Sequence, residues 1–182
     1  MKNRRLLISL ILVAGVAGLA VTGYALLGTE IRVSYMLLPM NVNELAKQSD
    51  MIVIARVKEI QPSVLDAGGP KGTWVWTDVV LDVERTLKGS VNDTNVSVRL
   101  GGGTAGGIKM IVSQEASLVQ GERVLLFLIK DLGSPRGDHY GVLGALQGKY
   151  LLANGLAENK DQMRNTSEKV LISEIASALR EQ

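Results

Sequence analysis

Apolar and polar residues alternate in several segments of this 182-residue chain between residues 51 and 153, a period of two that favours β-strands over helices. The alternation is longest over 74–87, where valines and leucines make one face and tryptophans and carboxylates make the other. Shorter alternating segments cover 51–60 and 95–100, and the continuous apolar run in 123–130 is typical of a strand buried on both faces. Gly- and Pro-containing turns separate these segments. The pattern predicts a mainly β domain, either a small barrel or a sandwich.

Shorter elements complete the prediction. Strands are expected over 109–112, 140–145 and 149–153, and a long loop is expected between Pro62 and Gly72, where prolines and glycines cluster. No internal repeat is visible.

Helical spacing occurs on either side of the β region. Asn43 is expected to cap a short helix over 41–49. A C-terminal amphipathic helix is expected to begin near Thr166, because Asn165 and Glu168 have the spacing of a capping box. Its apolar positions recur at i, i+4, i+7 and i+8: Leu171, Ile175, Ala178 and Leu179.

The segment Leu6–Leu27 carries no charge over 22 residues and follows the basic residues Lys2, Arg4 and Arg5. A helix needs about 20 apolar residues to cross a bilayer core, whereas a cleaved signal has an apolar core of roughly 7 to 15. The length predicts a transmembrane signal anchor within residues 1–28, and a signal peptide is the alternative. Because basic residues stay in the cytoplasm, the N-terminus would be cytoplasmic and the rest outside a cell membrane crossed once, or secreted after cleavage.

Outside the host cytoplasm, the three N-x-S/T sequons become relevant. They begin at Asn92, Asn95 and Asn165, and they would carry sugar only in a host that modifies exported proteins.

The excess positive charge belongs to the N-terminal head. Residues 41–182 contain 16 of the 20 basic and 17 of the 18 acidic residues. A polyanion-binding surface is therefore disfavoured, and nucleic acid is not an expected partner. The chain has no Cys and one His, which excludes disulfides, cysteine-ligated metals and thiol catalysis.

Trp74 and Trp76 should project together from the less apolar side of their strand. Neighbouring exposed aromatic rings can stack on sugars, bases or a partner's side chains. The alternatives are burial under a loop or the C-terminal helix, or contact with the membrane interface. We take both tryptophans as candidate ligand-binding residues.

A glycine-rich segment is the second candidate, because consecutive backbone N–H groups can cradle an anion. It lacks the Gly-Lys-Ser/Thr ending of a phosphate loop and precedes a strand, which favours an ordinary inter-strand loop. Its glycines are Gly101, Gly102, Gly103, Gly106 and Gly107.

An enzyme would have to use the carboxylates Asp78, Asp82 and Glu84 or the lone His139. The carboxylates fit a solvated strand face, where Arg56 of the preceding strand could oppose them in a hairpin, and the histidine fits a polar turn. The sequence assigns no catalytic residue, metal or cofactor.

Several segments resemble a known arrangement: Ser49–Val57, Leu87-Lys88-Gly89, Gly121–Leu128 and Gln147-Gly148-Lys149. They are similar to the OB-like barrel of the netrin-like module, as in the N-terminal domain of tissue inhibitors of metalloproteinases, and to exported prokaryotic proteins with Gly-rich loops. The resemblance covers residues 49–152 and implies the fold. Those inhibitors present an N-terminal cysteine to zinc, and this chain has no cysteine, so no inhibitory residue is carried over.

The chain is thus expected to comprise a signal segment, a tether over 29–40, an OB-like barrel domain over 41–155, and a linker with the C-terminal helix over 156–182. The expected function is a membrane-tethered extracytoplasmic module that binds a protein or envelope component. A hydrolase-like envelope enzyme and a purely structural envelope protein are the alternatives.

Overall fold

The computed structural model describes residues 28–69, 72–91, 94–131 and 139–181. Its centre is a closed barrel of five strands in the order β8, β2, β4, β5 and β9, with β9 returning to pair with β8. Neighbouring barrel strands are antiparallel, except that β5 and β9 run parallel through the single pair Val98 and Tyr140. The predicted mainly β class and barrel are confirmed, and a small closed barrel of five strands is compatible with the OB-like arrangement.

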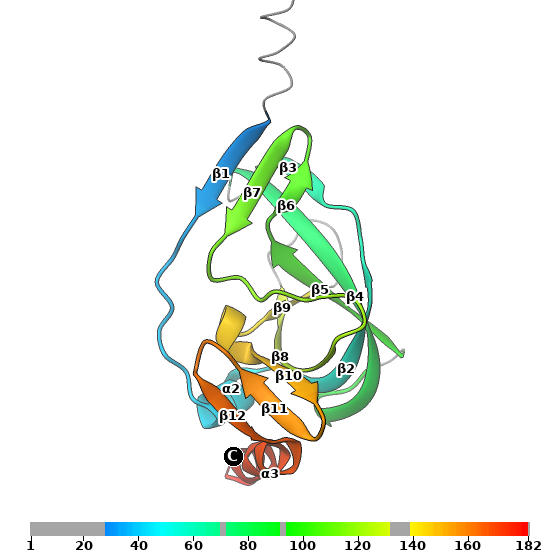
Figure 1. Ribbon diagram of the computed structural model, residues 1–182, viewed down its shortest axis with the longest axis vertical. Coiled ribbons are helices and arrows are strands. Elements are labelled where there is room, and N and C mark those ends of the chain that lie inside the picture. The colour runs from blue at the N-terminus through cyan, green and yellow to red at the C-terminus, as the bar shows by residue number, and fades with distance from the viewer. Residues whose placement is uncertain (1–27, 70–71, 92–93, 132–138, 182) are drawn as a thin grey trace, which may run out of the picture.

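The elements are shown in Figure 1. The strands are β1 (Thr29–Val33), β2 (Met51–Ile60), β3 (Val64–Gly69), β4 (Gly72–Lys88), β5 (Asn95–Gly101), β6 (Gly103–Ala105), β7 (Ile108–Val112), β8 (Arg123–Asp131), β9 (His139–Val142), β10 (Lys149–Ala153), β11 (Leu156–Asn159) and β12 (Arg164–Ser167). The helices are α2 (Val42–Gln48), the 3₁₀ turn η1 (Ala145–Gly148) and α3 (Glu168–Arg180).

Two apolar clusters lie on opposite faces of β2 and β8. Val53 and Leu126 belong to the cluster inside the barrel, whereas Ile54 and Phe127 point the other way, where α2 and α3 cover them. All of Val124–Leu128 is buried, which confirms the prediction of a strand buried on both faces.

Four segments predicted to be irregular form strands instead. One is the expected glycine loop, where Gly103–Ala105 forms β6 and pairs with β7. Within the expected loop of residues 62–72, β3 makes a hairpin with β4. β1 lies in the expected tether and pairs in parallel with β7, while β11 and β12 occupy the expected linker and extend the sheet beyond β10. These strands are short or lie at sheet edges, so they lack the long apolar alternation by which the others were predicted.

The rest of the expected tether is fixed to the domain. Over residues 34–40 the chain has no regular structure, yet Gln147 accepts a hydrogen bond from the Met40 N–H (2.7 Å) and donates one to the Leu38 carbonyl (3.2 Å). Gln162 donates to the Met40 carbonyl (2.7 Å). Side-chain amides thus supply the partners that a strand ladder would otherwise supply.

Helix α2 begins two residues earlier than a cap at Asn43 would allow. Its N-cap is Asn41, which accepts from the Glu44 N–H (2.9 Å), and the Glu44 carboxylate accepts from the Asn41 N–H (2.8 Å). This reciprocal capping box satisfies two N–H groups that the helix itself cannot pair.

At α3 the predicted capping box of Asn165 and Glu168 is wrong. Ser167 is the N-cap, and the Glu168 carboxylate instead accepts two hydrogen bonds from Arg123 of β8, at 2.8 and 3.0 Å. These bonds hold the pKa of Glu168 below its ordinary value. The ion pair fastens the first turn of α3 to the barrel.

The depressed pKa of Glu168 makes this fastening pH-dependent. Its contribution to stability is complete above the ordinary pKa of glutamate and is lost as the pH falls through the lower, folded-state pKa. The free energy of unfolding from urea titrations should therefore fall more steeply for the native chain than for E168Q between about pH 6 and pH 3. The control is E181Q at the exposed far end of α3, which should follow the native curve; a parallel E168Q curve would contradict the assignment.

Candidate functional site

Trp74 and Trp76 lie side by side on the outer face of β4. Val75 and Val79 of the same strand are buried on its inner face, and the tryptophans alternate with them as predicted. The two indole centroids are 5.5 Å apart with the ring planes inclined by 42°, and both side chains are half-buried. Val64 of β3 pairs with Trp76 and, at 40% exposure, adds apolar surface beside it.

Gly101 of β5 makes room for this pair. It lies opposite Trp76 in the sheet, and a Cβ there would lie 3.3 Å from Trp74 Nε1 and 3.1 Å from a carboxylate oxygen of Glu115. The same Glu115 oxygen accepts a hydrogen bond from the Gly101 N–H (2.9 Å). The glycine therefore lets an indole and a carboxylate approach the β5 backbone together.

A polar cluster continues the same outer face next to Trp76. Asp78 pairs with Arg99 across β4 and β5, and Arg99 donates from Nε and Nη2 to the two Asp78 oxygens, both at 2.7 Å. Arg99 Nη2 also lies 2.8 Å from His139 Nε2. Because a guanidinium only donates, this contact assigns the acceptor role to Nε2 and the proton to Nδ1, which lies 3.2 Å from Ser97 Oγ.

The charged side chains of this cluster are largely buried. The Arg99 side chain is 6% exposed and that of Asp78 is 16% exposed. A charge removed from water to this degree requires a partner. Arg99 lies on β5 and His139 on β9, so the cluster also joins the two strands that share only one backbone pair.

The other carboxylates do not gather with Asp78. Asp82 is exposed and lies opposite Arg56, as expected for the hairpin, and Glu84 accepts from Arg123 at 2.6 Å. Asp78 and Asp82 are four residues apart on one strand, about 13 Å, whereas the paired catalytic carboxylates of glycoside hydrolases stand about 5 to 9.5 Å apart. Among the described residues, no three His, Asp or Glu side chains converge on a possible metal position.

The glycine segment forms the β6–β7 hairpin and its approach. Gly106 and Gly107 make its two-residue turn with φ of 57° and 75°, the left-handed pair that suits such a turn. The N–H of Gly102 donates to the Val75 carbonyl (2.8 Å), and that of Gly101 is taken by Glu115. With two N–H groups engaged and a carboxylate beside them, this part of the segment is occupied by the protein itself.

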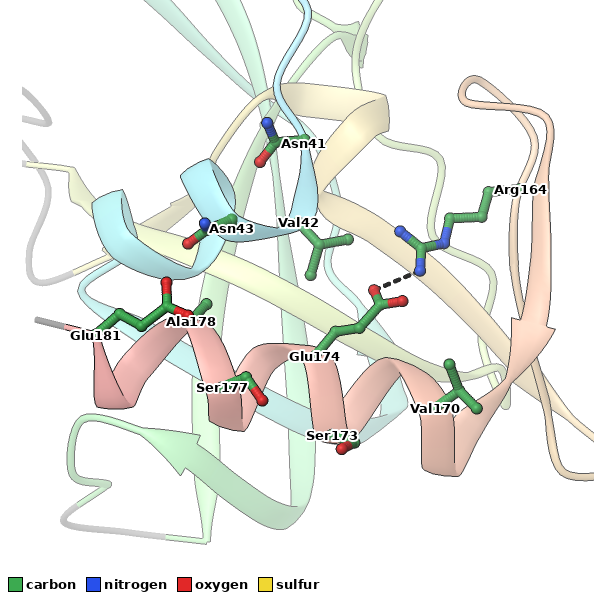
Figure 2. Close-up of a pocket in the computed structure, with 10 residues that line it drawn as sticks. All are labelled: Asn41, Val42, Asn43, Arg164, Val170, Ser173, Glu174, Ser177, Ala178 and Glu181. Carbon is green, nitrogen blue, oxygen red and sulfur yellow. Dashed lines mark hydrogen bonds and ion pairs between the residues drawn. The ribbon is translucent and has the colours of Figure 1, made fainter.

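A groove elsewhere in the molecule contains none of the predicted site residues. It has a volume of about 550 Å³ between α2, β12 and α3, and Figure 2 shows the ion pair of Arg164 and Glu174 at one end and Ser173 and Ser177 along α3. Its lining is largely polar side chains and small apolar ones, with no aromatic ring.

Sequence reasoning placed Trp74, Trp76 and Asp78 on one face but missed Arg99, Ser97 and Glu115. Arg99 could have been recognised as a candidate, because it is the one charged residue among the buried apolar positions of its strand. Of the sequon residues, Asn95 and Asn165 are exposed, and Asn92 lies outside the described residues.

No family model matches the chain, and no curated protein is significantly similar to it in sequence. Within the part of the chain that the structure describes, no helix is long and apolar enough to cross a membrane; the predicted span Leu6–Leu27 lies outside that part.

Replacing Gly103 tests the packing of the glycine segment. Its φ is +123°, and a Cβ would collide with the Ser63 hydroxyl and lie 2.6 Å from that of Thr77. G103A should lower the free energy of unfolding by more than about 2 kcal/mol. G121A is the matched control, because Gly121 also has a positive φ but nothing within 4 Å; about 1 kcal/mol is expected there. Equal losses would show that the close approach is unimportant.

Replacing Asp78 tests the polar cluster. D78N removes the charge of the carboxylate that accepts two hydrogen bonds from the buried Arg99, and the free energy of unfolding in urea should fall by about 3 kcal/mol. E30Q removes a carboxylate from exposed ion pairs with Arg32 and Lys109 and should change stability little. A D78N protein as stable as E30Q would contradict the structural importance of the cluster.

Proposed function

We propose that this protein is a membrane-tethered, extracytoplasmic binding module, and that it binds an envelope component on the outer face of β4 and β5. The observation that supports this most is the pair of half-buried, adjoining indoles of Trp74 and Trp76. Paired rings on an otherwise polar strand face offer a broad apolar contact with little entropy to lose on binding.

The barrel gives a second line of support. β4 and β5 are the second and third strands of the five in chain order, and the β2–β4 connection contains the β3 hairpin. OB-type barrels bind oligosaccharides and oligonucleotides on the face of their second and third strands, beside the connection that precedes the second. This support is an analogy between folds, in keeping with the netrin-like resemblance. It supports this face as the binding surface and does not identify a ligand.

The chemistry of the face favours a saccharide over a nucleic acid. Arg99 and Asp78 neutralise each other beside Trp76, and residues 41–182 contain one more acidic than basic residue. A phosphate backbone would find little positive charge here. A sugar presents apolar C–H faces to an indole and hydroxyl groups to neighbouring polar side chains, which is the combination that this face offers.

Intrinsic fluorescence tests the proposal directly, because Trp74 and Trp76 are the two tryptophans of the chain. The full chain in detergent should show a saturable emission change with at least one of three tetrasaccharides: those of N-acetylglucosamine, cellulose and maltose. W76A should weaken that binding by tenfold or more, about 1.4 kcal/mol.

Y35A is the matched control, because Tyr35 is an aromatic residue with 40% exposure outside the β4–β5 face; binding by this variant should be unchanged. Circular dichroism verifies that both variants are folded. Failure of all three sugars, or native-like binding by W76A, would refute a saccharide site at these residues and favour the structural alternative.

A further inference from the structure

We infer that the domain stands end-on upon the lipid bilayer, with the β6–β7 turn and the adjoining described ends of β3 and β4 against the membrane surface. The inference rests on the tether in the proposed function and adds an orientation and a lipid contact. The bilayer that holds the predicted span Leu6–Leu27 is the occupant of this end of the domain.

The first step is the short distance between the predicted span and the first strand. Only Gly28 separates Leu27 from Thr29, where β1 begins. Two Cα–Cα steps cover at most about 7.6 Å. The Thr29 N–H donates to the Gly107 carbonyl (3.0 Å), so the Gly106–Gly107 turn lies beside the point where the chain would leave the membrane.

The second step places the β3–β4 hairpin at the same level. A Cβ on Gly106 would lie 2.5 Å from Leu65 Cδ2, and Leu65 pairs with Val75 of β4. Trp74 is therefore level with the β6–β7 turn. From Trp74 the strand continues two residues outward to Gly72, about 7 Å at roughly 3.3 Å per residue.

Figure 1 shows the same arrangement for the whole domain: β1, β3, β6 and β7 gather at one end, and α3 with the C-terminus lies at the other. A span that leads directly into β1 brings the first end to the bilayer surface. The groove between α2 and α3 then lies at the end away from the bilayer.

The residues of the near end suit a headgroup layer. Thr73, Thr104 and Gly106 are exposed, and none of them presents a charge that would lose water. Lys109 and Arg32 share the carboxylate of Glu30, and Asp66 of β3 lies opposite Trp74, so these described residues carry no net charge. Trp74 stands at this level, and indoles concentrate at membrane interfaces.

Site-specific labels test the orientation, because a chain without native cysteine accepts one label wherever a cysteine is introduced. T73C and S173C place a fluorophore on exposed residues at opposite ends of the domain. Each full-length variant is reconstituted into phosphatidylcholine–phosphatidylglycerol vesicles that contain a lipid with a spin-labelled headgroup. The label of T73C should lose most of its emission relative to unlabelled vesicles, and the label of S173C should keep it.

Flotation of the vesicles separates the two hypotheses. If the chain does not float with the lipid, the proposed membrane tether is wrong, and the end-on orientation, which depends on it, is also rejected. If the chain floats but T73C is unquenched, or both labels are quenched alike, the tether stands and the end-on orientation is overturned. Quenching of the native tryptophans by the same lipid gives a check that needs no substitution, and absence of quenching would count against the inference.

Discussion

The backbone hydrogen bonds of β4 are the interaction on which the rest of this structure depends. This 17-residue strand pairs with β2 and β5 in the barrel and with β3 beyond it. Register shifts between β2 and β4 mark bulges, which allow such a long strand to bend around a small barrel. Its inner residues fill the core, and its continuation carries Trp74 and the β3 hairpin outside the barrel. The proposed binding face and the proposed membrane contact thus adjoin on one strand and share Trp74.

Polar side chains join strands and helices where few backbone hydrogen bonds do so. The Asp78, Arg99 and His139 contacts join β4, β5 and β9 where the parallel pairing is shortest. Gln147 fixes the chain that leads into α2, and Arg123 fixes α3. Such bonds add only modest net stability when made, but leaving buried groups unpaired is costly, so they select one arrangement of the strands and helices.

The strong periodic signals predicted the centre of the fold. Residues 51–60, 74–87, 95–100 and 123–130 became β2, β4, β5 and β8, because long alternating or continuous apolar runs have few other ways to bury their side chains. Strands β1, β3, β11 and β12 could not be predicted in this way, because their partners, and not their own composition, make them strands.

Only part of the candidate site could be predicted from the sequence. The alternation of β4 was enough to place Trp74, Trp76 and Asp78 on one face. The approach of Arg99 and His139 depends on the pairing of β4 with β5 and of β5 with β9, which are contacts between distant residues. The cap of α3 failed for a related reason: Glu168 has the right spacing for a local bond, but Arg123 of another strand takes its carboxylate. Local pattern identifies candidates, and tertiary contacts decide which of them act together.

Amide hydrogen exchange along β4 tests most directly whether this strand is one cooperative element. Residues 73–76 pair with β3 and residues 79–83 with β2, and the two stretches should share a slow exchange regime set by opening of the whole domain. Fast exchange over 73–76 with continued protection over 79–83 would contradict this. The part of β4 that carries both tryptophans would then open independently of the barrel, and neither a preformed binding face nor a rigid membrane-facing end could be built on it.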